Sequence, residues 1–193
     1  LTYLASQVPQ LDPKEIDDVI VGCANPEGEQ GLQVGRLIAA RALGQEVPGM
    51  TINRYCASGL EAIAIAASKI NAGMGHCYVA GGAESMSLLP MTGYKLAPSY
   101  NAAMQNINYH VSMGHTAEAV AEKYQVTREQ ADAFSVRSHT LAAAAIRDCK
   151  FKDEIVPIVV KEVLVENNKR IEKETIIDTD EGVRADTSIE GLS

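Results

Sequence analysis

The chain lacks tryptophan and has only two phenylalanines among its 193 residues, although 46% of its residues are hydrophobic. Its apolar content is therefore largely aliphatic, with alanine, valine and isoleucine prominent. Such side chains suit the interior of a protein in which helices cover a parallel sheet. The composition predicts an α/β fold, and the length is sufficient for one or two domains with a sizeable core.

Long apolar runs and an excess of basic residues are also missing. No stretch approaches the roughly 20 consecutive apolar residues that a membrane-spanning helix needs. Aspartate and glutamate together number 25 against 17 lysines and arginines, which gives a net charge of −8. A surface this acidic argues against coating a nucleic acid, although a local basic pocket could still hold a phosphorylated ligand. We therefore expect neither a nucleic acid nor a membrane among the partners.

Paired cysteine motifs are absent as well. The four cysteines, at positions 23, 56, 77 and 149, form no Cys-x-x-Cys pair and no His/Cys spacing of a zinc site. Unpaired thiols are typical of a reduced compartment, so we expect a cytoplasmic protein without a bound metal. The chain starts at Leu1, no signal-peptide pattern follows, and the start reads as the middle of an element, which suggests a truncated chain.

Strands and helices alternate in the first part of the chain. Short apolar runs at residues 18–23, 50–55 and 76–81 predict three strands. Helices are predicted between them at 30–43 and 58–71, each followed by a glycine that can end a helix. Because the strands are apolar on both faces, we expect a parallel βαβαβ sheet covered by helices and joined by right-handed crossovers.

The character of the chain changes after this sheet. Residues 83–112 are rich in methionine, serine, asparagine, proline and tyrosine, and they predict a long loop with a functional or assembly role. Thr127 and Gln130 have the spacing of a capping box at a helix start. The elements predicted beyond the loop are two helices and a polar-edged β pair, at 116–124, 128–149, 155–165 and 169–177.

Cys56 stands where the second predicted strand ends and a helix begins. Ser58 and Glu61 have capping-box spacing, which places the helix start close to the thiol. A free thiol has a pKa of about 8.5, and the backbone N–H groups of a helix start favour the anionic form. Parallel sheets also place their sites at the carboxyl ends of strands. Position alone leaves two interpretations open, a nucleophile and the commoner buried structural cysteine.

Residues 53–63, NRYCASGLEAI, resemble the nucleophile region of the thiolase family. Further runs resemble the family in the same order along nearly the whole chain: GGAESMS at 81–87, MGHTAE at 113–118, REQADAF at 128–134 and FKDEIVP at 151–157. The resemblance implies the N-terminal half of a thiolase-like fold, with a βαβαβ mixed sheet, covering helices and an inserted α+β loop domain. It assigns residues 1–85 to the core, whose first strand is missing, and 86–193 to a loop domain that is incomplete at its C-terminal end.

The resemblance also implies an acyltransferase of fatty acid metabolism. The reaction is thiolysis of a 3-ketoacyl-CoA by coenzyme A to acyl-CoA and acetyl-CoA, or the reverse Claisen condensation. Cys56 is then the nucleophile that carries the acyl group as a thioester. Met113 matches a position that lines the pantetheine channel, and Arg184 matches an arginine that contacts the nucleotide end of coenzyme A. Coenzyme A thioesters are substrates here, and no tightly bound cofactor is expected.

The chain departs from the family in what it lacks. The second half of a thiolase supplies a histidine that activates the nucleophile and a cysteine that acts as acid and base, and neither motif occurs here. We therefore expect these residues alone to be inactive, and a homodimer or homotetramer for the full-length protein. Two alternatives stay open. One is a ketoacyl-synthase-like condensing enzyme acting on carrier-protein thioesters, against which the coenzyme-A-style loop domain and Arg184 argue. The other is a non-catalytic thiolase-like binding or assembly module.

Overall fold

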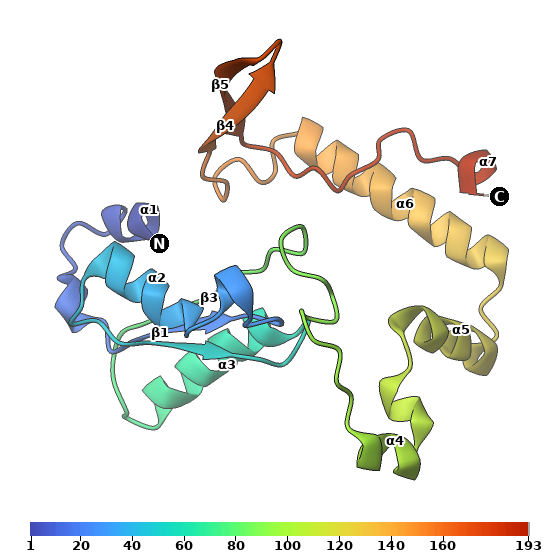
Figure 1. Ribbon diagram of the computed structural model, residues 1–193, viewed down its shortest axis with the longest axis horizontal. Helices are drawn as coiled ribbons and strands as arrows, with labels where there is room; N and C mark the ends of the chain where they lie inside the picture. The colour runs from blue at the N-terminus through green and yellow to red at the C-terminus, as the bar shows by residue number, and fades with distance from the viewer. Residues whose placement is uncertain (193) are drawn as a thin grey trace. The chain divides into compact units, whose positions relative to one another are not determined.

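The computed structural model describes residues 1–192. Along the chain it divides into two compact units, Leu1–Pro98 and the part that starts at Ser99. The first unit, blue to green in Figure 1, contains a sheet with covering helices, and the second contains helices and one hairpin. The domain boundary expected after residue 85 stays a prediction. The first unit continues past it, because Leu89 is buried and the Tyr94 N–H donates to Glu27 Oε2 at 2.9 Å.

The sheet of the first unit has three strands in the order β2-β1-β3. The strands are Gly49–Ile52 (β2), Asp18–Gly22 (β1) and Tyr78–Gly82 (β3). Both pairings are parallel, so the three predicted strands and their parallel arrangement are confirmed. Within residues 1–192 this sheet has no antiparallel strand, so the mixed sheet implied by the resemblance is not seen.

Helices α2 (Val34–Leu43) and α3 (Ser58–Asn71) connect these strands and lie on opposite faces of the sheet (Figure 1). The bounds of α3 agree with the prediction. Helix α2 begins later than the predicted residue 30, because a 3-10 turn is followed by left-handed backbone at Leu32 (φ 51°) and Gln33 (φ 62°). A short helix α1 (Thr2–Ser6) precedes the sheet.

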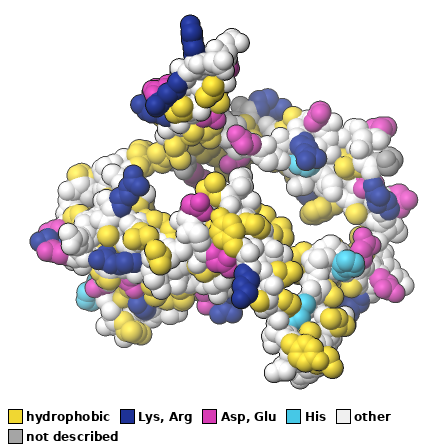
Figure 2. Space-filling view, in the orientation of Figure 1, with side chains coloured by type: hydrophobic (Ala, Val, Ile, Leu, Met, Phe, Trp, Pro, Cys, Tyr) yellow, Lys and Arg dark blue, Asp and Glu magenta, His cyan; other side chains and the backbone are white. Residues whose placement is uncertain are grey.

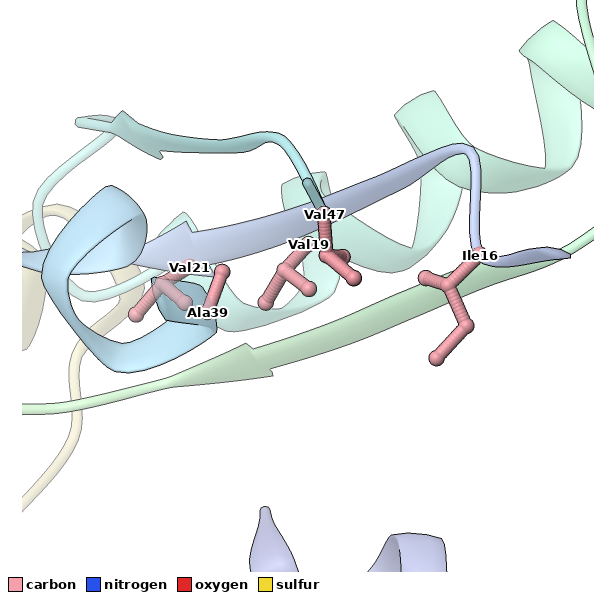
Figure 3. Packing of buried hydrophobic residues seen from close by; sticks show 5 residues of the cluster. All are labelled: Ile16, Val19, Val21, Ala39 and Val47. Atoms are coloured by element: carbon pink, nitrogen blue, oxygen red, sulfur yellow. The ribbon is translucent and has the colours of Figure 1, made fainter. Parts of the chain in front are cut away.

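Alternate residues of β1 enter two separate hydrophobic cores. Ile20 is fully buried against Ala62 and Ala66 of α3. The residues on the other face pack with α2 and the loops before β1 and β2, in a cluster of Ile16, Val19, Val21, Ala39 and Val47 (Figure 3). Because a helix covers each face, a polar residue at Val19, Ile20 or Val21 would lose apolar burial, which is worth about 1.5–3 kcal/mol for a large side chain.

Helix α3 lies so close to β1 that Gly22 has no room for a side chain. A Cβ at this position would lie 2.5 Å from the carbonyl carbon of Ser58 and 2.7 Å from its Cβ. Gly59, the next residue of α3, has no atom within 4 Å of the corresponding position. The first turn of α3 therefore rests directly on the end of β1.

The second unit starts with two short helices inside the segment predicted as a loop. They are α4 (Tyr100–Gln105) and the 3-10 helix η3 (Ile107–His110). The loop prediction for 83–112 is therefore wrong over this part. The side chains of Ser99 and Asn106 accept backbone N–H groups and cap the two helices, a local effect that the lack of apolar periodicity hides.

Helices α5 (Met113–Tyr124) and α6 (Arg128–Arg147) follow. Helix α5 begins before the predicted residue 116, because Ser112 caps it. The capping box of Thr127 and Gln130 at α6 is confirmed, with each side chain bound to the other residue's backbone.

An antiparallel hairpin and a short helix end the described chain. They are β4 (Ile158–Glu166), β5 (Lys169–Ile177) and α7 (Ile189–Leu192). The β pair is confirmed, although β4 begins later than residue 155. The two asparagines between the strands both have left-handed backbone, which suits a tight hairpin turn.

The distribution of basic side chains on the surface and the hydropathy of the helices agree with the composition of the sequence. On the face shown in Figure 2, lysines and arginines are scattered among acidic side chains and form no continuous basic area. Of the helices within residues 1–192, none combines the length and the apolar character needed to cross a membrane.

A carboxylate joins the amino ends of β1 and β3. Asp17 Oδ2 accepts the backbone N–H groups of His76 at 2.6 Å and Cys77 at 3.0 Å. These two donors, that of Cys77 first, hold the pKa of Asp17 below its ordinary value. The ionised form is therefore favoured in the folded protein, and its contribution to stability is lost as the pH falls through the folded pKa.

We predict that Asp17→Asn lowers the free energy of unfolding at pH 7 and weakens its dependence on pH below about 4, where the wild-type carboxylate becomes protonated. Urea unfolding at pH 7 and pH 3 measures both effects. Glu46→Gln is the control, because Glu46 forms only an exposed ion pair with Lys14. An unchanged pH dependence in Asp17→Asn would contradict the assignment.

We predict that Gly22→Ala destabilises the protein by about 1–3 kcal/mol, because the new methyl group has to displace the first turn of α3. Gly59→Ala is the matched control. It adds the same methyl group one residue away in open space, and should be neutral or stabilising by up to about 1 kcal/mol. Urea unfolding of both variants tests the comparison, and equal effects would show that the contact with Ser58 is not the cause.

Candidate active site

Cys56 lies in the turn between β2 and α3, at the carboxyl edge of the parallel sheet. Strand β2 ends at Ile52 and α3 begins at Ser58, so the predicted helix start beside the thiol is confirmed. The thiol is exposed. An exposed cysteine does not fit the alternative of a buried structural residue, and an accessible thiol at this edge can meet a ligand.

The backbone just before Cys56 has an uncommon conformation. Tyr55 has a φ of 48°, in the left-handed region, which costs a bulky residue about 1–3 kcal/mol. Asn53 stabilises this conformation. Its Oδ1 accepts the Tyr55 N–H at 2.8 Å, and its Nδ2 donates to the Ala24 carbonyl at 2.9 Å. The residue before the thiol is thereby tied to the end of β1.

Ser58 closes the other side of the turn. Its Oγ accepts the Arg54 N–H at 2.8 Å and donates to the Tyr55 carbonyl at 2.6 Å. The predicted capping box with Glu61 is therefore wrong. Ser58 is the first helical residue, and its hydroxyl binds the turn instead of the helix N–H groups. Glu61 forms a two-point ion pair with Arg54, with both N–O distances 2.9 Å.

A polar network joins the carboxyl ends of β1 and β3 beside this turn. Glu84 follows β3, and its Oε2 accepts the Ala24 N–H at 2.6 Å. Its Oε1 accepts from Gln30 Nε2, also at 2.6 Å. Gln30 is only 6% exposed, donates to the Asn25 carbonyl at 2.9 Å, and accepts the Ser85 N–H. The sequence predicts only that Glu84, a glutamate directly after a strand end, holds loops. Its partners Ala24 and Gln30 have no signal in the sequence.

Cys23 lies at the same edge of the sheet but in a different environment. It is 1% exposed and ends β1's apolar run. Burial, and to a lesser extent the negative charge of Glu84, raise the pKa of its thiol. Cys23 therefore stays protonated and inert at neutral pH, so the exposed Cys56 is the thiol of this edge that can react.

Met113 and Arg184 belong to the second unit, whereas Cys56 belongs to the first. Met113 starts α5 and lines an apolar hollow of about 410 Å³ with Ala117 and Val120 of the same helix. The backbone N–H of Arg184 donates to His139 Nδ1 at 3.1 Å. Its side chain is exposed and has no ion pair within residues 1–192, so the guanidinium is free to bind an anion.

Metal-ligating residues do not gather anywhere in the described part of the chain. Among residues 1–192, no group of three or more histidine, cysteine, aspartate or glutamate side chains lies close enough to hold a metal ion. The sheet edge itself presents an exposed thiol in a turn, beside the carboxylate and amide side chains of Glu84, Gln30 and Asn53.

Curated relatives of this chain are named as thiolases. The chain is 52% identical over 180 residues to the 3-ketoacyl-CoA thiolase of Bacillus subtilis (strain 168), covering 92% of this chain and 46% of the relative. It is 38% identical over 213 residues to the beta-ketoadipyl-CoA thiolase of Acinetobacter baylyi, covering 100% of this chain and 51% of the relative. The chain thus spans about half the length of the curated relatives it matches.

A solved structure gives the same result for the fold. The crystal structure of the Bacillus anthracis acetyl-CoA acetyltransferase aligns with a TM-score of 0.77 at 34% sequence identity, over 98% of this chain and 49% of that chain. Residues 3–193 also match the family described as "Thiolase, N-terminal domain". With the sheet, the cysteine turn and the match over nearly its whole length in agreement, this chain belongs to the thiolase family.

Proposed function

We propose that the protein is an acyltransferase in which Cys56 accepts the acyl group of a 3-ketoacyl-CoA. One observation carries the proposal. An exposed thiol lies in a strained turn between β2 and α3 of a thiolase-family chain, beside the start of a helix. Two relatives named for ketoacyl-CoA and ketoadipyl-CoA thiolysis support this substrate class.

The chemistry follows from the thiolate as nucleophile. Cys56 Sγ attacks the keto carbon of the substrate, and the bond between this carbon and the neighbouring carbon breaks. The acyl group stays on Sγ as a thioester, and the other fragment leaves as the enolate of acetyl-CoA, which takes up a proton. Coenzyme A then attacks the thioester through its sulfur, releases acyl-CoA and restores the thiol. The reverse sequence is the Claisen condensation.

Coenzyme A is a substrate of this reaction and not a resident cofactor. We assign Met113 to the pantetheine arm, because a flexible thioether at the rim of an apolar hollow suits an extended aliphatic chain. Arg184 is assigned to the nucleotide end, because its exposed guanidinium can pair with a phosphate. The chain has a net charge of −8, which repels a phosphate overall, so the Arg184 guanidinium provides a local attraction for the phosphate.

The wider setting is proposed from the family likeness. We place the protein in fatty acid metabolism in the cytoplasm, as a homodimer or homotetramer whose extra contacts involve residues 83–112. The core domain then comprises 1–85 and the loop domain 86–193. The sequence contains neither the histidine motif nor the second cysteine motif that the family uses for proton transfer, so we expect these residues alone to give no appreciable turnover.

We predict that acetyl-CoA transfers its acetyl group to Cys56 in the polypeptide as its gene encodes it. Acid quenching, digestion and mass spectrometry should find the label on the Cys56 peptide, and Cys56→Ala should abolish both label and turnover. Cys149→Ala is the control, because Cys149 is likewise exposed but lies after α6. A label on the Cys149 peptide, or active enzyme with no label on Cys56, would contradict the nucleophile assignment. Binding of coenzyme A with neither an acetyl label on Cys56 nor turnover would favour a non-catalytic module.

We predict that Arg184→Ala weakens coenzyme A binding by about tenfold, or about 1.4 kcal/mol, because one charge-assisted contact with a phosphate is lost. The loss should shrink at high salt, which screens an exposed ion pair. Isothermal titration calorimetry at two salt concentrations measures both effects. Arg147→Ala serves as the control, since Arg147 is exposed but already pairs with Asp148. Equal effects of the two substitutions would remove Arg184 from the binding site.

A further inference from the structure

We propose that Glu84 is a positioning residue for the nucleophile. Through Ala24 and Asn53, its carboxylate fixes the turn that presents Cys56. The proposal rests on the proposed function only where it names Cys56 as the nucleophile, because the hydrogen bonds that carry it are independent of the reaction.

The hydrogen bonds form an unbroken chain across the ends of three strands. Glu84, after β3, accepts the N–H of Ala24, which lies just after β1 (2.6 Å). The carbonyl of Ala24 accepts from Asn53 Nδ2, just after β2 (2.9 Å). Asn53 Oδ1 then accepts the N–H of Tyr55, the left-handed residue before Cys56 (2.8 Å). Since Ala24 uses its N–H and its carbonyl in this chain, a displacement of Ala24 at one bond is transmitted to the other.

Gln30 explains why position 84 needs a carboxylate. Both oxygens of Glu84 accept, one from Ala24 and one from Gln30 Nε2. A glutamine at 84 would direct its own NH₂ group at one of these two donors. Gln30 cannot turn its amide to compensate, because its Oε1 accepts the Ser85 N–H and its Nε2 also donates to the Asn25 carbonyl. Gln30 is buried, with 6% of its surface exposed, so its amide has little access to water, whereas Glu84 is an exposed residue.

The first unit contains a matched carboxylate at the opposite edge of the sheet. Asp17 also joins β1 to β3, through the N–H groups of His76 and Cys77. It lies at the amino ends of the parallel strands, whereas Cys56 follows the carboxyl end of β2. Asp17 therefore stabilises the same pair of strands without touching the turn of Cys56, and its removal reports the effect of lost stability alone.

The test measures the second-order rate constant for alkylation of Cys56 by iodoacetamide in the folded polypeptide as its gene encodes it. The rate is followed on the Cys56 peptide by mass spectrometry, because Cys149 is exposed as well. We expect both Glu84→Gln and Asp17→Asn to lower the Tm. Only Glu84→Gln should slow alkylation, by about tenfold, which is smaller than the roughly hundredfold loss of rate that a 1 Å misplacement of a reacting group can cause. An unchanged or faster rate in Glu84→Gln, or an equal slowing in Asp17→Asn, would overturn the proposal.

A second variant interrupts the series of hydrogen bonds and leaves Glu84 unchanged. Asn53→Asp keeps an acceptor for the Tyr55 N–H and removes the donor to Ala24. It should slow alkylation as Glu84→Gln does, and it keeps the test available if Glu84→Gln fails to fold. A wild-type rate in Asn53→Asp would show that Ala24 does not transmit the effect, and would overturn the proposal.

A double variant provides the rescue. In Gln30→Glu with Glu84→Gln, the amide at 84 can donate to the carboxylate at 30, which still accepts the Ser85 N–H but no longer donates to the Asn25 carbonyl. The double variant should recover part of the alkylation rate that Glu84→Gln loses, whereas Gln30→Glu alone brings two carboxylates together and should be slow. No recovery in the double variant would overturn the pairing of Glu84 with Gln30.

The outcome is separable from that of the proposed function, because alkylation requires no acyl transfer. If Glu84→Gln slows alkylation but acetyl-CoA leaves no label on Cys56, the positioning role stands and the nucleophile role fails. If Cys56 is acetylated but its alkylation rate is the same in Glu84→Gln as in the wild type, only the positioning role fails. In active enzyme, Glu84→Gln should lower kcat and leave the KM for coenzyme A unchanged, since Glu84 acts on the turn of Cys56 and not on the coenzyme A contact assigned to Arg184.

Discussion

The close contact between Gly22 and Ser58 is the constraint on which the site depends. Because no side chain separates the end of β1 from α3, the first turn of the helix is held at the carboxyl edge of the sheet. Ser58 is thereby 4% exposed, and its hydroxyl binds the backbone of Arg54 and Tyr55. The turn that carries Cys56 is fixed at its helix end by packing, and the thiol stays on the outside, where a substrate can reach it.

Carboxylates then fix the two edges of the sheet. Three short parallel strands bury few residues, so their ends depend on side chains that accept the N–H groups left over by the ladder. Asp17 does this at the amino edge and Glu84 at the carboxyl edge. At the carboxyl edge, burial and to a lesser extent the charge of Glu84 raise the pKa of the Cys23 thiol. The two thiols at this edge therefore differ first in exposure, since Cys23 is buried and Cys56 is exposed.

The sequence was informative where one local pattern decides the structure. Residues 19–23 are apolar on both faces, and this pattern predicts a buried parallel strand. The Thr127 and Gln130 pair predicts its capping box for the same local reason. The Ser58 and Glu61 pair has the same spacing, yet its capping box is absent, because Ser58 is buried beneath β1 and its hydroxyl is needed by the turn. Spacing cannot tell which partner a hydroxyl will find once the helix is packed.

The sequence by itself therefore determined the strand and helix order, the family through its ordered motifs, and Cys56 as the residue to examine. Only the tertiary structure decided how that residue is held. Glu84 lies 60 residues from Ala24, and Asn53 lies 29 residues from it, so no local pattern records either contact. The physical reason is that hydrogen-bond partners at a sheet edge are chosen by which strand ends lie side by side, and a parallel sheet brings together residues that the sequence keeps far apart.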